Sequence, residues 1–87
     1  MLKEWHDQAW DDYMYWQGQD KKTLRKINSL IRDIERTGND STGQTEFLKG
    51  NLSGWASAKI DQQNRFIYKV EGEVLKILSC RGHYSDK

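Results

Sequence analysis

The sequence predicts an α+β fold in which two N-terminal antiparallel helices pack on one face of a curved antiparallel β-sheet. Apolar residues recur at helical spacing up to about residue 36, and they alternate with polar residues at strand spacing from about residue 46. Short polar turns separate these segments. A chain of 87 residues has the length of one small domain, and we expect residues 1–87 to form it.

The N-terminal quarter of the chain predicts a short strand followed by a helix. Residues 2–5 are the candidate strand, and residues 7–17 follow as the first helix. The helix has an apolar stripe with i, i+3, i+4, i+7 spacing, made of Trp10, Tyr13, Met14 and Gln17. Acidic residues lie between these positions, and Gly18 is expected to end the helix.

A second helix is predicted over residues 21–36. Asp20 is a good N-cap, and Gly38 stands where a left-handed C-terminal glycine belongs. Its apolar stripe consists of Leu24, Ile27, Leu30, Ile31 and Ile34. The very short connection between the helices requires an antiparallel hairpin. Residues 38–44 are expected to form a polar loop.

The second half of the chain predicts an antiparallel meander. Its strands are expected over residues 54–60, 65–70 and 74–81. Residues 61–64 and 71–73 form the two connections, and Gly72 can supply a positive φ in the second. Because side chains alternate between the faces of a strand, Arg65 lies opposite Phe66. If Phe66 meets the helices, Arg65 points into the uncovered face, and Lys59 on the neighbouring strand could join it.

Composition narrows the class of protein. Hydrophobic residues make up 36% of the chain and charged residues 31%, which fits a soluble globular domain. The net charge of +1 is the sum of −4 over residues 1–20, +4 over residues 21–36 and +1 over the rest of the chain. There is no apolar stretch of membrane-spanning length and no signal peptide. A lone cysteine, Cys80, indicates a reducing environment, so we expect a cytoplasmic protein.

Four residues together carry the chemistry of metal-free RNA cleavage: Glu46, Arg65, His83 and Tyr84. That reaction needs a base for the 2′-hydroxyl, an acid for the leaving 5′-oxygen and a cation for the phosphate charge. Each residue taken alone has a plainer interpretation as a solvated, ion-paired or packing side chain. Cys80 and the four tryptophans are expected in the core, although some tryptophans could lie in an interface. No cluster with metal-ligand spacing is present, so no metal or cofactor is expected.

Six segments resemble the YoeB toxins of the RelE superfamily, and together they cover about residues 3–84. These segments are residues 9–16 (AWDDYMYW), 20–22 (DKK), 26–34 (KINSLIRDI), 48–54 (LKGNLSG), 64–68 (NRFIY) and 80–84 (CRGHY). The resemblance implies a microbial-RNase fold and a ribosome-dependent endoribonuclease that cuts mRNA in the A site. It also implies a cognate YefM-type antitoxin, with a homodimer possible.

The resemblance also implies a role for each site residue. Glu46 corresponds to the general base, Arg65 to the residue that stabilises the phosphate, and His83 to the general acid. Tyr84 corresponds to a residue that positions the substrate. Lys49 falls on a position expected to touch the RNA backbone, and Lys59 and Arg81 are further candidates for RNA binding.

The chain departs from the family pattern at several points. Residues 57–60 read SAKI where the family has Ser-Arg-Arg-Ile, and residues 43–49 (GQTEFLK) lack two prolines and a lysine. Gly82 replaces a larger residue, which predicts a looser C-terminus, and residues 85–87 are additional. Reduced positive charge predicts weaker ribosome binding or altered codon preference. Two alternatives stay open: an antitoxin-binding protein with little nuclease activity that acts in transcriptional autoregulation, and a ribosome-independent RNase.

Overall fold

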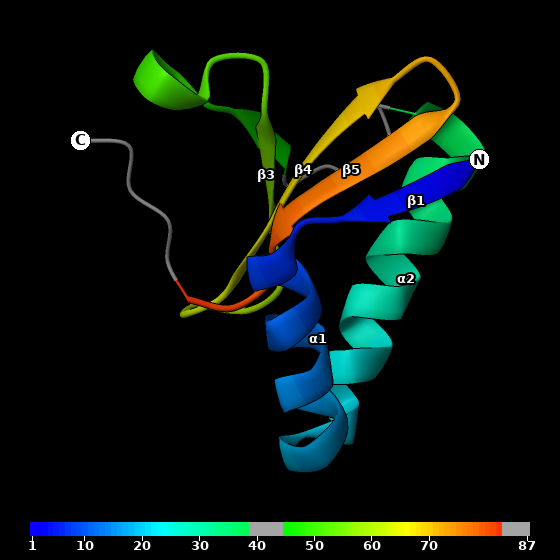
Figure 1. Cartoon of the computed structure of the whole chain (residues 1–87). Helices are drawn as coiled ribbons and strands as arrows, with labels where there is room; N and C mark the ends of the chain where they lie inside the picture. The colour runs from blue at the N-terminus through cyan, green and yellow to red at the C-terminus, as the bar shows by residue number, and fades with distance from the viewer. Residues whose placement is uncertain (39–44, 83–87) are drawn as a thin grey trace.

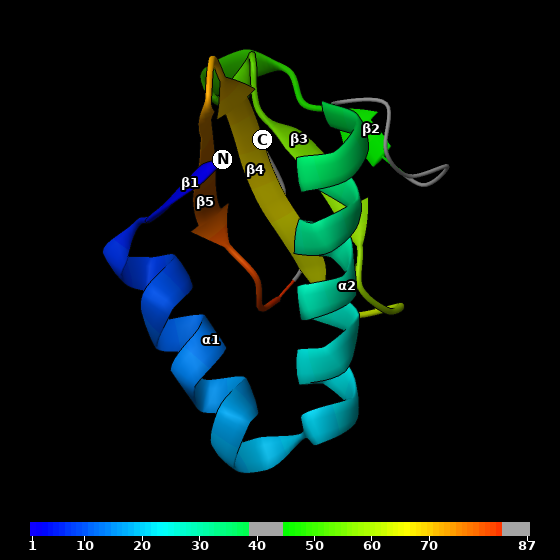
Figure 2. The ribbon, with the colours of Figure 1, turned by 90° about the vertical axis from the view of Figure 1, so that its right-hand side faces the viewer.

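The computed structural model describes residues 1–38 and 45–82 as two helices and a five-stranded sheet. In chain order the elements are β1 (Leu2–Trp5), α1 (Asp7–Gln19), α2 (Lys21–Thr37), β2 (Thr45–Phe47), a 3-10 helix (Gly50–Leu52), β3 (Ala56–Lys59), β4 (Arg65–Glu71) and β5 (Val74–Ser79). Both helices lie on one side of the sheet (Figures 1 and 2). The predicted fold class is confirmed. Most of the predicted loop over 38–44 falls outside the described residues.

The sheet is mixed, with strand order β1-β5-β4-β3-β2. Strands β3 to β5 correspond to the three predicted strands of the antiparallel meander, and β2 extends it by pairing antiparallel with β3. The N-terminal strand β1 pairs in parallel with β5, so that Leu2 lies opposite Val74. A parallel pair needs a long crossover connection, and here the helical hairpin and the first three meander strands supply it. The predicted positive φ of Gly72 is confirmed at 58°.

Helix α1 buries a different stripe from the predicted one. Its buried residues are Ala9, Asp12 and Trp16, whereas Trp10 is 46% exposed and Met14 39% exposed. The prediction failed because it treated Asp12 as a solvent-facing acid, and this carboxylate has hydrogen-bond partners in the interior. Of the four tryptophans expected in the core, only Trp16 is buried. Gly18 also lies inside the helix rather than ending it.

Helix α2 follows the prediction closely. Asp20 caps its N-terminus by accepting hydrogen bonds from the backbone N–H groups of Lys22 and Thr23. Asp20 is also the single residue between the two helices. Gly38 ends the helix with φ 72° and ψ −144°. Its φ is positive, as predicted, but its ψ lies outside the left-handed helical region.

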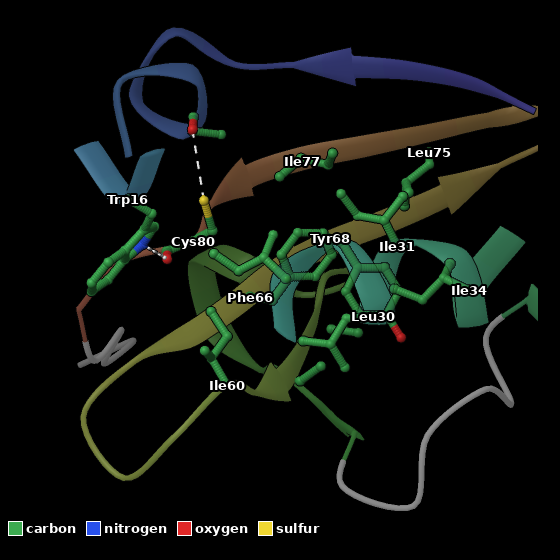
Figure 3. Close-up of a cluster of buried hydrophobic side chains, with 14 residues drawn as sticks. Trp16, Leu30, Ile31, Ile34, Ile60, Phe66, Tyr68, Leu75, Ile77 and Cys80 are labelled. Atoms are coloured by element: carbon green, nitrogen blue, oxygen red, sulfur yellow. Dashed lines mark hydrogen bonds between the residues drawn. The ribbon is translucent and has the colours of Figure 1, made fainter. Parts of the chain in front are cut away.

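The core lies between the helices and one face of the sheet. Ile27 and Ile34 of α2 pack with Phe66 and Tyr68 of β4, and all four are fully buried. Figure 3 shows Ile34, Phe66 and Tyr68 in this cluster. The side chains that alternate with Phe66 and Tyr68 therefore point to the opposite face, which we call the outer face. This result confirms the expected direction of Arg65.

A β-bulge reverses the alternation near the end of β5. Ile67 pairs with Ser79 while Tyr68 pairs with Ile77, so Leu78 has no partner on β4. A bulge inserts one residue and turns the following side chains to the other face. Cys80 consequently points into the core, where it is fully buried.

Candidate active site

Glu46, Lys59 and Arg65 share the outer face of the sheet. Glu46 pairs with Ser57 across β2 and β3, and Lys59 pairs with Arg65 across β3 and β4. Directly paired residues have Cβ atoms about 5 Å apart, and diagonal neighbours such as Glu46 and Lys59 lie roughly 7–8 Å apart. The register therefore places an exposed carboxylate beside two cations.

The pair Lys59 and Arg65 puts two positive charges directly opposite each other. Like charges at such positions destabilise a sheet unless an anion compensates them. Neither side chain forms an ion pair with an acidic residue in the described ranges, whereas Lys3, Arg36, Lys69 and Lys76 all do. This part of the outer face is electrostatically suited to hold an anion such as a phosphate.

The sequence suggested an uncovered outer face, but part of this face is buried. Ile67 is fully buried and Ser57 is 5% exposed, although both lie on this face between the charged residues. Arg65 itself is partly buried. Reduced contact with water strengthens the interaction of these charges with a bound anion.

The chain segment that leads to His83 is anchored beside Arg65. The backbone N–H of Arg65 donates to the Gly82 carbonyl at 3.0 Å, and the N–H of Gly82 donates to Asn64 Oδ1 at 2.8 Å. Gly82 has a φ of 88°, which favours glycine. Gly82 itself is thus held by two hydrogen bonds, and the expected looseness of the C-terminus concerns residues outside the described ones. His83 and Tyr84 lie outside the described residues.

Two residues of α1 hold the same segment at Cys80. Asp12 Oδ2 accepts from the Cys80 N–H at 3.0 Å. Trp16 Nε1 donates to the Cys80 carbonyl at 2.9 Å, as Figure 3 shows. Burial, with a smaller contribution from Asp12, raises the pKa of the Cys80 thiol to about 12. A thiol with this pKa stays protonated, so Cys80 is a packing residue as predicted and not a nucleophile.

The remaining candidates for RNA binding lie around this site. Lys49 is exposed two residues after β2, at the start of the 3-10 helix. Arg81 lies with its guanidinium 3.6 Å from the centre of the Tyr15 ring on α1. Such stacking holds Arg81 against the helix. Contact of Lys49, Lys59 or Arg81 with RNA stays a prediction.

Position 58 contributes to the core instead of to the charged surface. Ala58 is fully buried among the side chains that face the helices. The expectation that the change at 58 removes a cation from the site is therefore wrong, because alternation along β3 gives only Ser57 and Lys59 to the outer face. Lys59 remains the one departure of this strand that bears on the charge of the site.

The opposite end of the outer face is neutralised by ion pairs. Glu71 binds Lys69 at 3.0 Å and Lys76 at 2.8 Å, and Lys76 also approaches Glu4 at 3.8 Å. The hydrogen bond from Lys76, together with that from Lys69, lowers the pKa of Glu71. On the outer face, the cations that have no acidic partner among the described residues are thus at the Lys59 and Arg65 end.

Two contributors to the site, Asp12 and Asn64, were not predicted. The signal for Asp12 was its spacing of three and four residues from Ala9 and Trp16, on one helix face. Nothing in the sequence signals the contact of Asn64 with Gly82. Within residues 1–38 and 45–82, no three His, Cys, Asp or Glu side chains are grouped to hold a metal ion.

Comparison with known proteins decides the family. Residues 5–84 match the model of the "YoeB-like toxin of bacterial type II toxin-antitoxin system". The chain belongs to the YoeB toxin family. Toxin YoeB of Escherichia coli K12 is 46% identical over 80 residues, which span 92% of this chain and 95% of that relative.

Solved structures of YoeB proteins share the fold. A YoeB/ParE toxin from Agrobacterium tumefaciens aligns with a TM-score of 0.91 and 41% identity, covering 97% of this chain and 100% of that one. A YoeB–YefM complex from Staphylococcus aureus gives 0.88 and 40%, with 97% and 99% covered. A YoeB dimer from the same species gives 0.89 and 40%, with 97% and 98% covered.

No described helix is both long and apolar enough to cross a membrane.

Proposed function

We propose that this YoeB-family chain is a ribosome-dependent endoribonuclease that cleaves mRNA in the A site and so inhibits translation. The observation that carries the proposal is the pair of uncompensated cations, Lys59 and Arg65, beside the carboxylate of Glu46 on the outer face. Metal-free cleavage of RNA uses this combination of base and phosphate-binding cation.

The proposed chemistry is an in-line transesterification within the RNA. Glu46 takes the proton of the 2′-hydroxyl, and the 2′-oxygen attacks the adjacent phosphorus. Arg65 stabilises the charge that develops on the phosphorane, and His83 protonates the 5′-oxygen as its bond to phosphorus breaks. Tyr84 orients the nucleotide by stacking. The products carry a 2′,3′-cyclic phosphate and a 5′-hydroxyl.

Dependence on the ribosome follows from the small charge of the chain. Affinity for free RNA depends mainly on phosphate neutralisation, and a net charge of +1 supplies little of it. Lys49, Lys59 and Arg81 are the proposed contacts to the RNA backbone. Efficient cutting of naked RNA at catalytic protein concentrations would favour the ribosome-independent alternative.

The deciding experiment maps mRNA cleavage with and without ribosomes. Purified termination complexes supply the ribosome-bound mRNA, and the reaction without ribosomes is also run in EDTA. The wild type is compared with His83→Ala, Glu46→Gln and Arg65→Ala. We expect each variant to lose about 100-fold or more in cleavage rate. Glu73→Gln, an exposed acid at the β4–β5 turn, is the matched control and should cleave like the wild type. Unchanged cleavage by a His83→Ala/Glu46→Ala double variant would overturn the mechanism.

We also propose a YefM-type antitoxin as partner and a homodimer as the free form. The structures of staphylococcal relatives with these assemblies support both. A second support is the exposed aromatic surface of α1, where Trp10 packs against Trp5 and Tyr13 beside the exposed Met14. Aromatic residues and methionine are enriched at protein interfaces. For the homodimer, Trp10→Lys should shift sedimentation toward the monomer, whereas Arg25→Ala on α2 should not.

A further inference from the structure

The side chain of Asn64 connects the β3–β4 turn with the segment that leads to His83. Its Oδ1 accepts the Gly82 N–H at 2.8 Å, and its Nδ2 donates to both carboxylate oxygens of Asp61, at 3.0 and 3.1 Å. An amide can satisfy these partners in one orientation only, because its nitrogen cannot accept a hydrogen bond. The amide of Asn64 is therefore fixed between Asp61 and Gly82.

The turn that carries Asn64 is itself well ordered by hydrogen bonds. Asp61 Oδ1 accepts the backbone N–H groups of Gln63 at 2.8 Å and Asn64 at 2.7 Å. Burial acts to raise the pKa of Asp61, but the hydrogen bonds from Asn64 and Gln63 outweigh it and lower the pKa. The Asp61 carboxylate is thus charged at neutral pH and remains a strong acceptor for Asn64.

Both polar backbone groups of Gly82 are held by the start of β4. Asn64 accepts its N–H, and the N–H of Arg65 donates to its carbonyl. Its φ of 88° is a conformation that residues other than glycine rarely adopt, although an added Cβ would meet nothing within 4 Å. Residue 82 is therefore fixed in position and direction immediately before His83 and beside the proposed phosphate-binding residue.

We propose that Asn64 is a positioning residue for RNA cleavage: by holding Gly82 beside Arg65, it fixes the point from which the chain continues to His83. This inference rests on the proposed function. Asn64 does not touch the RNA in this role, and its effect is on the geometry of proton transfer. A misplacement of about 1 Å in a catalytic group can cost 10²-fold in rate.

The test measures kcat and KM for ribosome-bound mRNA in the wild type, Asn64→Ala and Gln62→Ala. Gln62 is an exposed residue of the same turn and serves as the matched control. We expect Asn64→Ala to lower kcat by about 10-fold or more and to change KM by less than about two-fold. Its thermal midpoint and antitoxin binding should match those of Gln62→Ala, which should cleave like the wild type.

Two further measurements separate positioning from a general structural effect. The exchange variant Asp61→Asn/Asn64→Asp retains an acceptor for Gly82 and a donor–acceptor pair within the turn, so it should regain most of the lost kcat. The NMR order parameter of the Gly82 amide should fall in Asn64→Ala from the rigid value of about 0.85. It should stay unchanged in Gln62→Ala.

The possible outcomes are distinguishable. If the wild type does not cleave ribosome-bound mRNA, the proposed function fails, and this inference fails with it. If the wild type cleaves and Asn64→Ala keeps its kcat, the inference alone is overturned. A lowered kcat that the exchange variant does not restore, with an unchanged Gly82 order parameter, also overturns it.

Discussion

Tyr68 places a polar atom in the core without a hydrogen bond. Its ring is fully buried on β4, and its hydroxyl has no partner in the described part of the chain. In the unfolded chain, water forms hydrogen bonds with this hydroxyl. Burying the hydroxyl without a partner therefore destabilises the folded state relative to the unfolded state. We expect Tyr68→Phe to leave the free energy of unfolding unchanged or to raise it by up to about 1 kcal/mol. Urea denaturation would measure this, and a clear loss of stability would reveal an overlooked partner.

Asp12 shows the opposite case, a buried carboxylate with partners. It accepts hydrogen bonds from Gln8 Nε2 and from the backbone N–H of Cys80. Asp12→Ala leaves that buried N–H without an acceptor, which should cost about 1–3 kcal/mol of unfolding free energy. Asp12→Asn keeps an acceptor oxygen and should lose less. Equal losses in the two variants, measured by urea denaturation, would contradict the assigned role of the Cys80 hydrogen bond.

Some features of the candidate site were predictable from the sequence, and others were not. Alternation along β4 correctly predicted that Arg65 points away from the helices, because Phe66 is an obvious core residue. The contact between Asn64 and Gly82 was not predictable, because it joins residues 18 positions apart through a turn geometry that composition does not reveal. The positive φ of Gly82 was not predictable for the same reason: a glycine can indicate a loose chain or a positive φ, and the sequence does not distinguish them.

At the scale of helices, Gly18 offers a stability test. It lies within α1, near its end, and an added Cβ would meet nothing within 4 Å. Alanine loses less backbone entropy on folding than glycine, so Gly18→Ala should raise the free energy of unfolding by ~0.5–1 kcal/mol. Gly72→Ala is the control: its φ of 58° is unfavourable for alanine, and stability should fall by about 1–2 kcal/mol. Thermal or urea unfolding would compare the two.

The cap of α2 predicts a dependence of stability on pH. Hydrogen bonds from the side chain and backbone of Thr23 lower the pKa of Asp20 below its ordinary value of 3.8. The folded state therefore favours the ionised form, and the resulting stability is complete above pH 3.8 and is lost as the pH falls through the lower, folded-state pKa. Asp20→Asn can still cap the helix. We expect it to be less stable than the wild type at pH 7, with a gap that shrinks in acid.

Elements with a single strong signal were predicted well, and those with competing signals were not. Helix α2 has an unambiguous stripe and cap, and its predicted bounds differ by one residue from the observed ones. Helix α1 carries apolar residues on two faces, and only tertiary packing decides which face is buried. The parallel pairing of β1 was also missed, since four residues with little pattern give no direction.

At the scale of the whole molecule, charge should govern docking on the ribosome. In the proposed complex, Lys49, Lys59 and Arg81 contact phosphates of the RNA backbone, and Arg65 binds the phosphate that reacts. Each phosphate contact adds about 0.9 to the slope of log affinity against log salt on duplex DNA, and we expect a similar effect on structured RNA. Lys59→Ala should weaken ribosome binding and reduce this slope by roughly 1.

Lys59→Arg tests the same idea in the opposite direction. It supplies the bidentate guanidinium that a lysine lacks, so it should tighten binding. Ribosome pelleting over a salt series would measure both variants, in a Glu46→Gln background that suppresses cleavage. Equal slopes for the wild type and Lys59→Ala would exclude Lys59 from the phosphate contacts.

The position of β1 beside β5 has a consequence for how the protein is made. Leu2 precedes its partner Val74 by 72 positions in the chain. Strand β1 must therefore remain without its partner until β5 has been translated, and this edge of the sheet forms only afterwards. An interrupted translation product lacks both this strand partner and the segment from Cys80 to Gly82. The candidate site is thus completed only after β5 and the segment that follows it have been translated.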